Sequence, residues 1–265
     1  MIQGIRKLFR TRQDGPPPQV PPGERVYAVG DVHGRCDLFD ALVAAIEADD
    51  ARRAPAETTI VLLGDLVDRG PDSAGVLEAA RALQQRRKTR IIAGNHEEMF
   101  LKSFDDLELF RHFLRYGGRE TVLSYPVDRA AYTAADLAEA QEMMRVVVPE
   151  ADRRFIEGFE DAVEIGDYLF VHAGIRPGLP LEEQKVQDLR WIREPFLGHA
   201  GSHGAVVVHG HTITDAPEMT HNRIGIDTGA YKSGRLTALG LEGGERWFVE
   251  TTAAHGEVAI ASRAA

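Results

Sequence analysis

Three polar clusters, each introduced by a glycine, close three apolar runs in the first hundred residues. They are Gly30-Asp31-Val32-His33-Gly34, Gly64-Asp65-Leu66-Val67-Asp68-Arg69-Gly70 and Gly94-Asn95-His96-Glu97. The runs before them, 26–29, 59–63 and 90–93, are short and apolar on both faces, which is typical of strands in a covered parallel sheet. The clusters are roughly thirty residues apart, the length of a strand–helix–strand unit. Because the carboxyl ends of parallel strands form the ligand crevice of such sheets, we expect the polar side chains to converge there.

The chain between and beyond the clusters has a helical pattern. The spacing of apolar residues predicts helices at 37–48 and 73–83, each covering a face of the sheet. From Gly94 to about Ile156 the sequence is rich in helical pattern, with glycine and proline interruptions. This segment could cap the site.

Turn signals in the second half of the chain predict two hairpins. They pair 162–165 with 168–172 around Gly166-Asp167, and 236–241 with 246–250 around Gly243-Gly244. These segments indicate a second half of antiparallel strands with few helices. We therefore expect an α/β fold in which two mixed sheets pack together with helices outside.

Composition limits the class of protein. With 265 residues, 43% of them hydrophobic, the chain can form one large α/β core, and we expect a flexible, basic and proline-rich tail at 1–23 followed by a single domain at 24–265. A single cysteine, Cys36, favours a reducing compartment, the cytoplasm. The net charge of −10 argues against nucleic acid as a partner, and no apolar stretch is long enough for integral membrane association. The sequence predicts no oligomeric state.

Two histidines in the second half also follow apolar runs. They bring the set of candidate metal ligands to Asp31, His33, Asp65, Asn95, His172 and His211. Oxygen and imidazole ligands without thiolate suit manganese, iron or zinc, and shared carboxylates hold paired cations about 3.5–4 Å apart. The pattern therefore indicates a hydrolase with two divalent transition-metal ions, with manganese expected first.

With these motifs the chain resembles the calcineurin-like metallophosphoesterases, and within them the bacterial serine/threonine phosphoprotein phosphatases. The resemblance covers 25–241 and consists of the three clusters, His-Ala-Gly at 172–174, Trp191-Ile192-Arg193-Glu194 and Gly-His-Thr at 210–212. It implies a four-layer α/β/β/α sandwich. It also implies that Asp31 and His33 bind the first metal, that Asp65 bridges, and that Asn95, His172 and His211 bind the second.

The resemblance assigns roles to the remaining charged residues of the motifs. Arg69 and Arg193 are expected to bind the substrate phosphate as planar, permanently charged forks, together with Asn95. A hydroxide that bridges the metals would attack phosphorus, and His96 would give a proton to the leaving group. Asp68 would orient His96 and keep it cationic. Arg190, three residues before Arg193, is an alternative phosphate ligand.

Other polar residues near the motifs have structural explanations. Glu97 and Glu98 are expected to start a helix, where carboxylates suit the helix dipole. His209 is expected to be a packed strand histidine, and Cys36 a buried and inert thiol.

For the substrate, the sequence favours a phosphoprotein or a small phosphoester. The alternative is a symmetrical diadenosine polyphosphate hydrolase, a sister branch with almost the same motifs. That substrate would need surfaces on which bases stack, whereas the chain has two tryptophans and 7% aromatic residues, with Trp191 expected in the core or the wall of the site. A non-catalytic metal or phosphate sensor would have lost a ligand or the acid, and this chain keeps all of them. We therefore expect a phosphopeptide to be preferred over diadenosine tetraphosphate.

Overall fold

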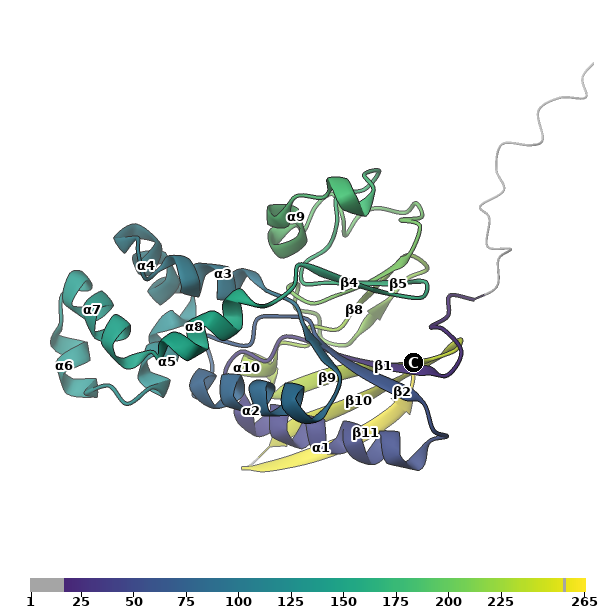
Figure 1. Ribbon diagram of the computed structural model, residues 1–265, viewed down its shortest axis with the longest axis horizontal. Helices are drawn as coiled ribbons and strands as arrows, with labels where there is room; N and C mark the ends of the chain where they lie inside the picture. Colours follow the sequence, from purple (N-terminus) through teal and green to yellow (C-terminus); the bar gives the residue numbers. More distant parts are fainter. Residues whose placement is uncertain (1–16, 255) are drawn as a thin grey trace, which may run out of the picture.

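The structure is a computed structural model that describes residues 17–254 and 256–265, and these residues form two mixed sheets with helices outside them (Figure 1). The first sheet has the order β11-β10-β9-β1-β2-β3 and the second the order β4-β5-β6-β8-β7. The strands of the first sheet are β1 (Glu24–Val29), β2 (Glu57–Leu62), β3 (Thr89–Ile91), β9 (Arg235–Glu242), β10 (Glu245–Ala254) and β11 (Glu257–Ala264). Those of the second are β4 (Ala162–Ile165), β5 (Tyr168–Val171), β6 (Val206–His209), β7 (Glu218–Met219) and β8 (Arg223–Gly225).

Helices cover the outer faces of both sheets. Helices α1 (Cys36–Arg52) and α2 (Ser73–Arg86) lie on the first sheet, and α9 (Val186–Trp191) lies on the second (Figure 1). The four-layer α/β/β/α sandwich expected from the sequence is therefore confirmed.

The helix-rich segment forms a lobe at one end of the sandwich (Figure 1). It consists of α3 (Asn95–Lys102), α4 (Leu107–Phe113), the π-helical η1 (Leu114–Gly118), α5 (Arg119–Ser124), α6 (Arg129–Ala134), α7 (Leu137–Val147) and α8 (Glu150–Glu157). Two short helical segments, η2 (Leu181–Glu183) and α10 (Ala230–Ser233), lie in later connections.

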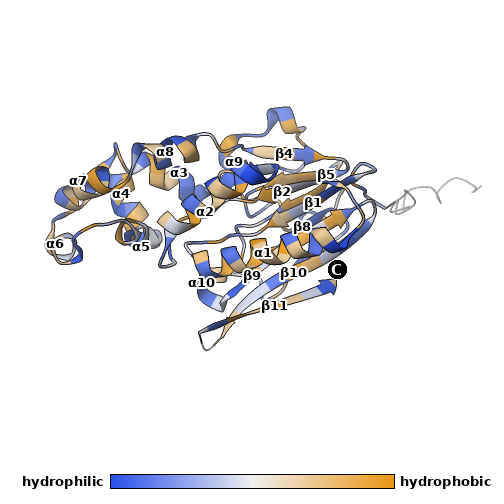
Figure 2. Ribbon diagram, turned by 60° about the horizontal axis from the view of Figure 1, so that its bottom comes forward, coloured by the Kyte–Doolittle hydropathy of each residue, from blue (hydrophilic) through white to orange (hydrophobic). Residues whose placement is uncertain are grey.

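Strand β1 shows why apolar residues occupy both faces of the central strands. Val26 and Ala28 pack into the core between the sheets, whereas Tyr27 and Val29 pack into the core under the helices. Side chains of a strand alternate between faces, so a strand covered on both sides is apolar throughout. In Figure 2, β1 and β2 are coloured mostly hydrophobic, while α1 shows both colours.

The two predicted hairpins are confirmed, but the second half is not all antiparallel. Ile165 pairs with Tyr168 in the first hairpin, and Glu242 pairs with Glu245 in the second. Strand β6, however, runs parallel to both β5 and β8. The sequence argument missed this because the connections between these strands are long, and local turn signals report only adjacent pairs. The parallel arrangement brings the carboxyl ends of β5 and β6 to the same edge.

The predicted tail and domain boundary are only partly covered by the structure, because residues 1–16 lie outside the described residues. Within the described part, Val20 is buried and its backbone N–H donates to the carbonyl of Gly243 at 3.1 Å. The backbone N–H of Gln19 donates to the Asp167 carboxylate at 2.9 Å. Residues just before β1 therefore contact both sheets.

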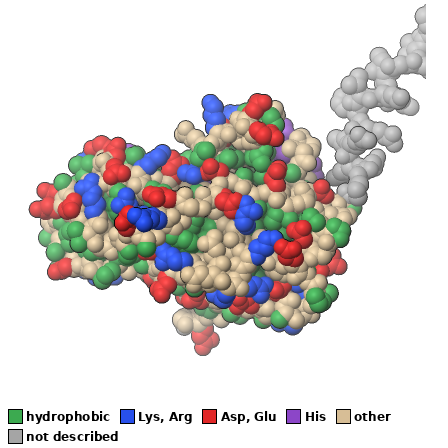
Figure 3. Space-filling view, viewed as in Figure 1, with side chains coloured by type: hydrophobic (Ala, Val, Ile, Leu, Met, Phe, Trp, Pro, Cys, Tyr) green, Lys and Arg blue, Asp and Glu red, His purple; other side chains and the backbone are tan. Residues whose placement is uncertain are grey.

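The described surface has two features that bear on partners. No described helix has both the length and the hydropathy that a membrane span requires. On the face drawn in Figure 3, acidic and basic side chains of the described residues are interspersed, and no continuous basic surface is seen there.

Candidate metal centre

The strand ends of both sheets meet at one edge and bring the six predicted ligands together. Asp31 and His33 follow β1, Asp65 follows β2, and Asn95 begins α3 directly after β3. His172 follows β5 and His211 follows β6. All six side chains are buried. Polar groups are buried in this way only when they bind each other or a ligand.

The backbone at this edge is strained at the residues that carry the chemistry. Among the described residues, the non-glycine residues with positive φ are His33, Asp65, Asp68, Arg69 and His211, with φ between 47° and 73°. Left-handed backbone is unfavourable for residues with a Cβ and persists where surrounding structure enforces it, commonly at functional sites. Each of these residues was predicted from the sequence as part of the site.

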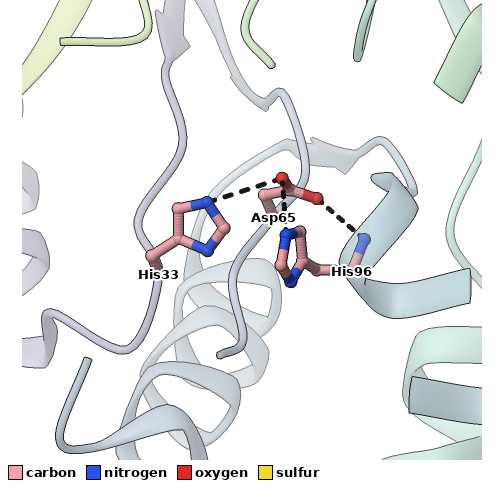
Figure 4. Close-up of side chains that lie close together, drawn as sticks. All are labelled: His33, Asp65 and His96. Carbon is pink, nitrogen blue, oxygen red and sulfur yellow. Dashed lines mark hydrogen bonds and ion pairs between the residues drawn. The ribbon is translucent and has the colours of Figure 1, made fainter. Parts of the chain in front are cut away.

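The Asp65 carboxylate lies at the centre of the cluster. Asp65, His33 and His96 form one group whose potential ligand atoms lie within 4.8 Å of one another, and Asp65, His172 and His211 form a second. The His33 Nε2 atom lies 3.5 Å from one carboxylate oxygen, and the His172 Nε2 atom lies 3.4 Å from the other. Figure 4 shows His33 and His96 turned toward this carboxylate. One carboxylate is thus available to two cation positions.

The hydrogen bonds of the imidazole rings leave one nitrogen of each available as a ligand. The Nδ1 atom of His33 is 2.9 Å from the carbonyl of Val67, and that of His172 is 2.8 Å from the carbonyl of Leu63. Both Nδ1 atoms therefore donate, so the lone pair of each neutral ring lies on Nε2, as is usual in metal-ligating histidines. The Nε2 atom of His33 faces Nη1 of Arg69 at 2.7 Å, and that of His172 faces Oδ1 of Asn95 at 3.0 Å. The Nε2 atom of His211 is buried and has no hydrogen-bond partner among the described residues. Burial lowers the pKa of His211 to about 3, which keeps its ring neutral.

The acidic residues of the site also fit bound cations. Burial, with the nearby carboxylates of Asp227 and Asp65, raises the pKa of Asp31 well above its usual value. Burial likewise raises the pKa of Asp227 to about 6. Carboxylates grouped in this way favour a positive charge among them. We judge on these grounds that the residues fit a pair of divalent cations.

Sequence analysis missed Asp227. This buried residue follows β8 and Ile226, and its carboxylate accepts the backbone N–H of Gly229 at 2.9 Å. A polar residue that closes a short apolar run close to glycine resembles the signal of the first three clusters, although there the glycine comes directly before the polar residue. Applied to 224–229, it would have found Asp227.

Glu97 has a larger role than the predicted start of a helix. It does lie in the first turn of α3, but its buried carboxylate also accepts backbone N–H groups from the loop after β2. Asp65 donates to Oε2 at 2.8 Å and Leu66 donates to Oε1 at 2.7 Å. Gly94 also donates to Oε2 at 2.8 Å. Glu97 therefore joins two of the loops that carry candidate ligands.

Close backbone approach explains the glycine at 94. A Cβ atom built on Gly94 would lie 2.1 Å from a carboxylate oxygen of Asp65. Only glycine allows the two loops this separation.

Arg69 points its guanidinium group at the two histidines of the first group. Its Nη1 atom lies 2.7 Å from Nε2 of His33, and its Nη2 atom lies 2.8 Å from Nε2 of His96. The group also lies 4.8 Å from the ring centre of Tyr231. The guanidinium group of Arg69 is thus held at the edge of the cluster, and its positive charge faces the two histidines.

His96 and Asp68 form the predicted pair. The Nδ1 atom of His96 lies 2.6 Å from Oδ2 of Asp68, and the hydroxyl of Thr121 donates to Oδ1 of Asp68 at 2.6 Å. Burial opposes a charged ring, but the carboxylates of Asp65 and Asp68 outweigh it, and the pKa of His96 is raised. The Nδ1 proton is therefore held by Asp68, and Nε2 faces the site.

Arg193, not Arg190, is available to a ligand. The guanidinium of Arg190 is 2.7 Å from Asp161 and 3.5 Å from Glu98. Arg193 lines the cavity at the site, and no carboxylate among the described residues is ion-paired with it.

Two further residues near the motifs have structural environments. His209 is a buried strand residue, as predicted. Cys36 is only partly buried, contrary to the prediction of a buried thiol, because it lies at the first position of α1; burial still raises the pKa of its thiol to about 12.

A cavity of about 480 Å³ opens at the cluster. Its wall includes Asp65, Asn95, His96 and His211 from the site. From there it extends along α3 and α4 to η1 and to the end of α9. The helix-rich lobe therefore forms one wall of the site, as the sequence indicated.

The chain belongs to the calcineurin-like phosphoesterase family, whose model matches residues 24–232. A relative from Anoxybacillus flavithermus, the bis(5'-nucleosyl)-tetraphosphatase PrpE (asymmetrical), is 27% identical over 234 residues, which are 80% of this chain and 88% of the relative. A symmetrical bis(5'-nucleosyl)-tetraphosphatase from Acidovorax sp. is 31% identical over 182 residues, which are 69% of this chain and 51% of the relative.

Two solved structures show the same fold. A candidate diadenosine tetraphosphatase has a TM-score of 0.59 at 20% identity, with 93% of this chain and 98% of that chain covered. A cold-active protein tyrosine phosphatase has a TM-score of 0.57 at 19% identity, with 91% and 81% covered. The family and the site together define a metal-dependent phosphoesterase.

Proposed function

We propose that this protein is a two-metal hydrolase that cleaves dinucleoside polyphosphates. The observation that best supports two bound metal ions is the position of Asp65, whose carboxylate belongs to both groups of candidate ligands. Asp31 and His33 would hold one cation, and Asn95, His172 and His211 the other, with Asp65 shared. When bound, the cations would supply positive charge to the phosphate oxygens and lower the pKa of the attacking water.

The protein's own side chains would bind the phosphate and move a proton. Arg69 lies beside His33 and His96, so its guanidinium can turn from these rings to phosphate oxygens. Arg193, which lines the same cavity, would be the second phosphate ligand, since the guanidinium of Arg190 is held by Asp161. Once Arg69 has turned to the phosphate, Nε2 of His96 can carry a proton, which it would donate to the leaving oxygen while Asp68 stabilises the protonated ring through Nδ1.

The choice of substrate rests on the relatives and on the cavity. Relatives at 27% and 31% identity are named as bis(5'-nucleosyl)-tetraphosphatases. One argument for the phosphopeptides expected from the sequence was a shortage of aromatic side chains on which bases could stack. Tyr116 joins Trp191 in the wall of the cavity, which weakens that argument. A phosphoprotein remains the competing substrate.

The test is a comparison of substrates with purified protein loaded with manganese, at one metal concentration and one pH. We expect a higher kcat/KM for diadenosine tetraphosphate than for a phosphoserine peptide. Separation of the products distinguishes release of ATP and AMP from release of two ADP molecules. Asp65→Asn serves as the control for contaminating phosphatase. A higher kcat/KM for the peptide would overturn the proposal.

A further inference from the structure

The exposed aromatic side chains of this protein gather in one place. Among the described residues, the large hydrophobic side chains that are exposed include two aromatic ones, Tyr116 at 51% and Trp191 at 36%. Both line the cavity that opens at the metal-ligand cluster. Exposed aromatic surface that lies inside a concave site is typical of a ligand-binding surface.

Trp191 is held in a fixed orientation. Its indole N–H donates to Oε2 of Glu98 at 3.1 Å, and Glu98 in turn pairs with Lys102 and lies 3.5 Å from Arg190. Trp191 is also the last residue of α9, whose Leu189 is buried in the core on the outer face of the second sheet. The ring is therefore anchored at its polar edge while its surface remains accessible.

Tyr116 is presented by an irregular turn of helix. It lies in η1, where Gly117 has a φ of 107° and its carbonyl accepts the backbone N–H of Arg69 at 3.0 Å. That hydrogen bond connects the segment carrying Tyr116 to the arginine proposed to bind phosphate. An aromatic surface and a phosphate ligand are thus joined through the backbone.

The size of the cavity exceeds what a phosphoryl group requires. Its volume of about 480 Å³ is within the usual range of roughly 300–1,000 Å³ for sites that enclose a small organic ligand. Met99 and Leu109 add apolar surface to the wall, and the positive charge there comes from Arg69 and Arg193, since Lys102 is paired with Glu98. A ligand that suits this wall combines a flat aromatic group with several phosphates.

We propose that this cavity binds the nucleoside adjoining the cleaved phosphate, with the base stacked against Trp191 and Tyr116. This inference rests on the proposed function, because it assigns the non-reacting part of the same substrate. The stacking is specific to an aromatic base and does not depend on which base it is, since every base has a π-face.

Binding of adenosine tests this site without any hydrolysis. The probe is intrinsic tryptophan fluorescence of the manganese-loaded protein, which has two tryptophans. Trp247 is buried, and its indole N–H donates to Asp49 at 2.9 Å in another part of the fold. We expect adenosine to change the fluorescence of the wild-type protein and of Trp247→Phe, but not that of Trp191→Phe. An unchanged signal in the wild-type protein up to millimolar adenosine would count against the site.

Kinetics provide the second measurement. We expect Trp191→Ala and Tyr116→Ala each to raise KM for diadenosine tetraphosphate by at least about fivefold, the lower range of base stacking on an aromatic side chain. The KM for glycerol 2-phosphate, which has no base, should rise at least fivefold less in the same variants. Trp191→Phe should have a KM for diadenosine tetraphosphate close to that of the wild type, because it keeps an aromatic ring. Ile260→Ala, at an exposed position on β11, is the control.

The outcomes separate this inference from the proposed function. If the wild-type protein prefers diadenosine tetraphosphate but both alanine variants keep its KM, the cavity does not bind the base and the proposed function stands. If a phosphotyrosine peptide depends on Trp191 and Tyr116 while diadenosine tetraphosphate does not, the cavity binds a phosphopeptide side chain and this inference is wrong.

Discussion

Single residues at the site combine an unfavourable backbone with a specific chemical role. Asp65 has a φ of 50° and a buried carboxylate that lies near three histidines. Burial opposes its charge, but His172, His96 and His33 outweigh it and hold the pKa of Asp65 well below its usual value. An ionised carboxylate in the centre of the cluster is the group best suited to bind two cations at once.

Asp65→Asn should therefore lose metal at both positions. An amide has no negative charge and only one oxygen to share, so both cations would bind more weakly. Elemental analysis of the purified variant should give well under two metal ions per chain, against two for the wild type. Asp40→Asn, exposed on α1, is the matched control. Full occupancy and full activity in Asp65→Asn would contradict the shared-ligand assignment.

His96→Asn should reduce kcat by roughly 10²–10⁴ on an alkyl phosphate, the usual contribution of a general acid. An aryl phosphate should lose less, because a phenolate leaves more readily without a proton. The measurement is kcat on both substrates, with metal content determined in parallel. His221→Asn, exposed and outside the cavity, is the control. Equal losses on both substrates would assign His96 to metal binding or to structure.

At the level of elements, the site depends on loops that are fastened to one another. The loop after β2 and the start of α3 meet through Glu97, whose two carboxylate oxygens accept N–H groups from both. Parallel strands place such loops side by side, but they do not fix the distance between the ligands on different loops. The buried carboxylate of Glu97 fixes that distance by binding both loops.

Glu97→Gln should destabilise the fold by about 1–3 kcal/mol, the cost of leaving buried donors unsatisfied. In either orientation of the amide, its NH₂ group would face a backbone N–H that now donates to an oxygen. For a chain of this size the expected decrease in Tm is about 2–10 °C. Thermal unfolding of Glu97→Gln and of Glu78→Gln, exposed on α2, provides the comparison. Equal Tm values for the two variants would mean that Glu97 does not fasten the loops.

For the whole molecule, the candidate ligands connect the two halves of the sandwich. Asp31, His33, Asp65 and Asn95 come from the first sheet and its helices, and His172 and His211 come from the second sheet. Bound cations would therefore join segments that are far apart in the chain. They would also offset the repulsion among Asp31, Asp65 and Asp227.

Removal of metal should lower the stability of the entire fold. Binding to the folded state alone stabilises it by roughly 2.7 kcal/mol at a ligand concentration 100-fold above Kd. We expect chelation followed by dialysis to lower Tm, and manganese to restore it. The same treatment should shift the Tm of Asp65→Asn much less. A Tm that stays constant after elemental analysis has confirmed metal loss would show that the centre does not contribute to folding.

The candidate ligands, the central strands and the hairpins could be predicted because each depends on a local pattern. Asp31, His33, Asp65 and Asn95 follow apolar runs after glycine, and Gly166-Asp167 lies between two β-prone segments. Such signals act over a few residues, where backbone preference and side-chain alternation decide the structure. They identified the residues that meet at the edge of the sheets.

The tertiary structure alone decided what depends on packing between distant segments. The second role of Glu97, the parallel pairing of β6 and the ion pair of Arg190 with Asp161 all depend on partners that no local pattern names. Tyr116 and Trp191 are 75 positions apart in the sequence, and they line one cavity because the lobe lies against the end of α9. The sequence by itself thus determined which residues could hold metal and phosphate. Only the fold decided what lies beside them, because the free energy of packing depends on surfaces that are formed when the chain has folded.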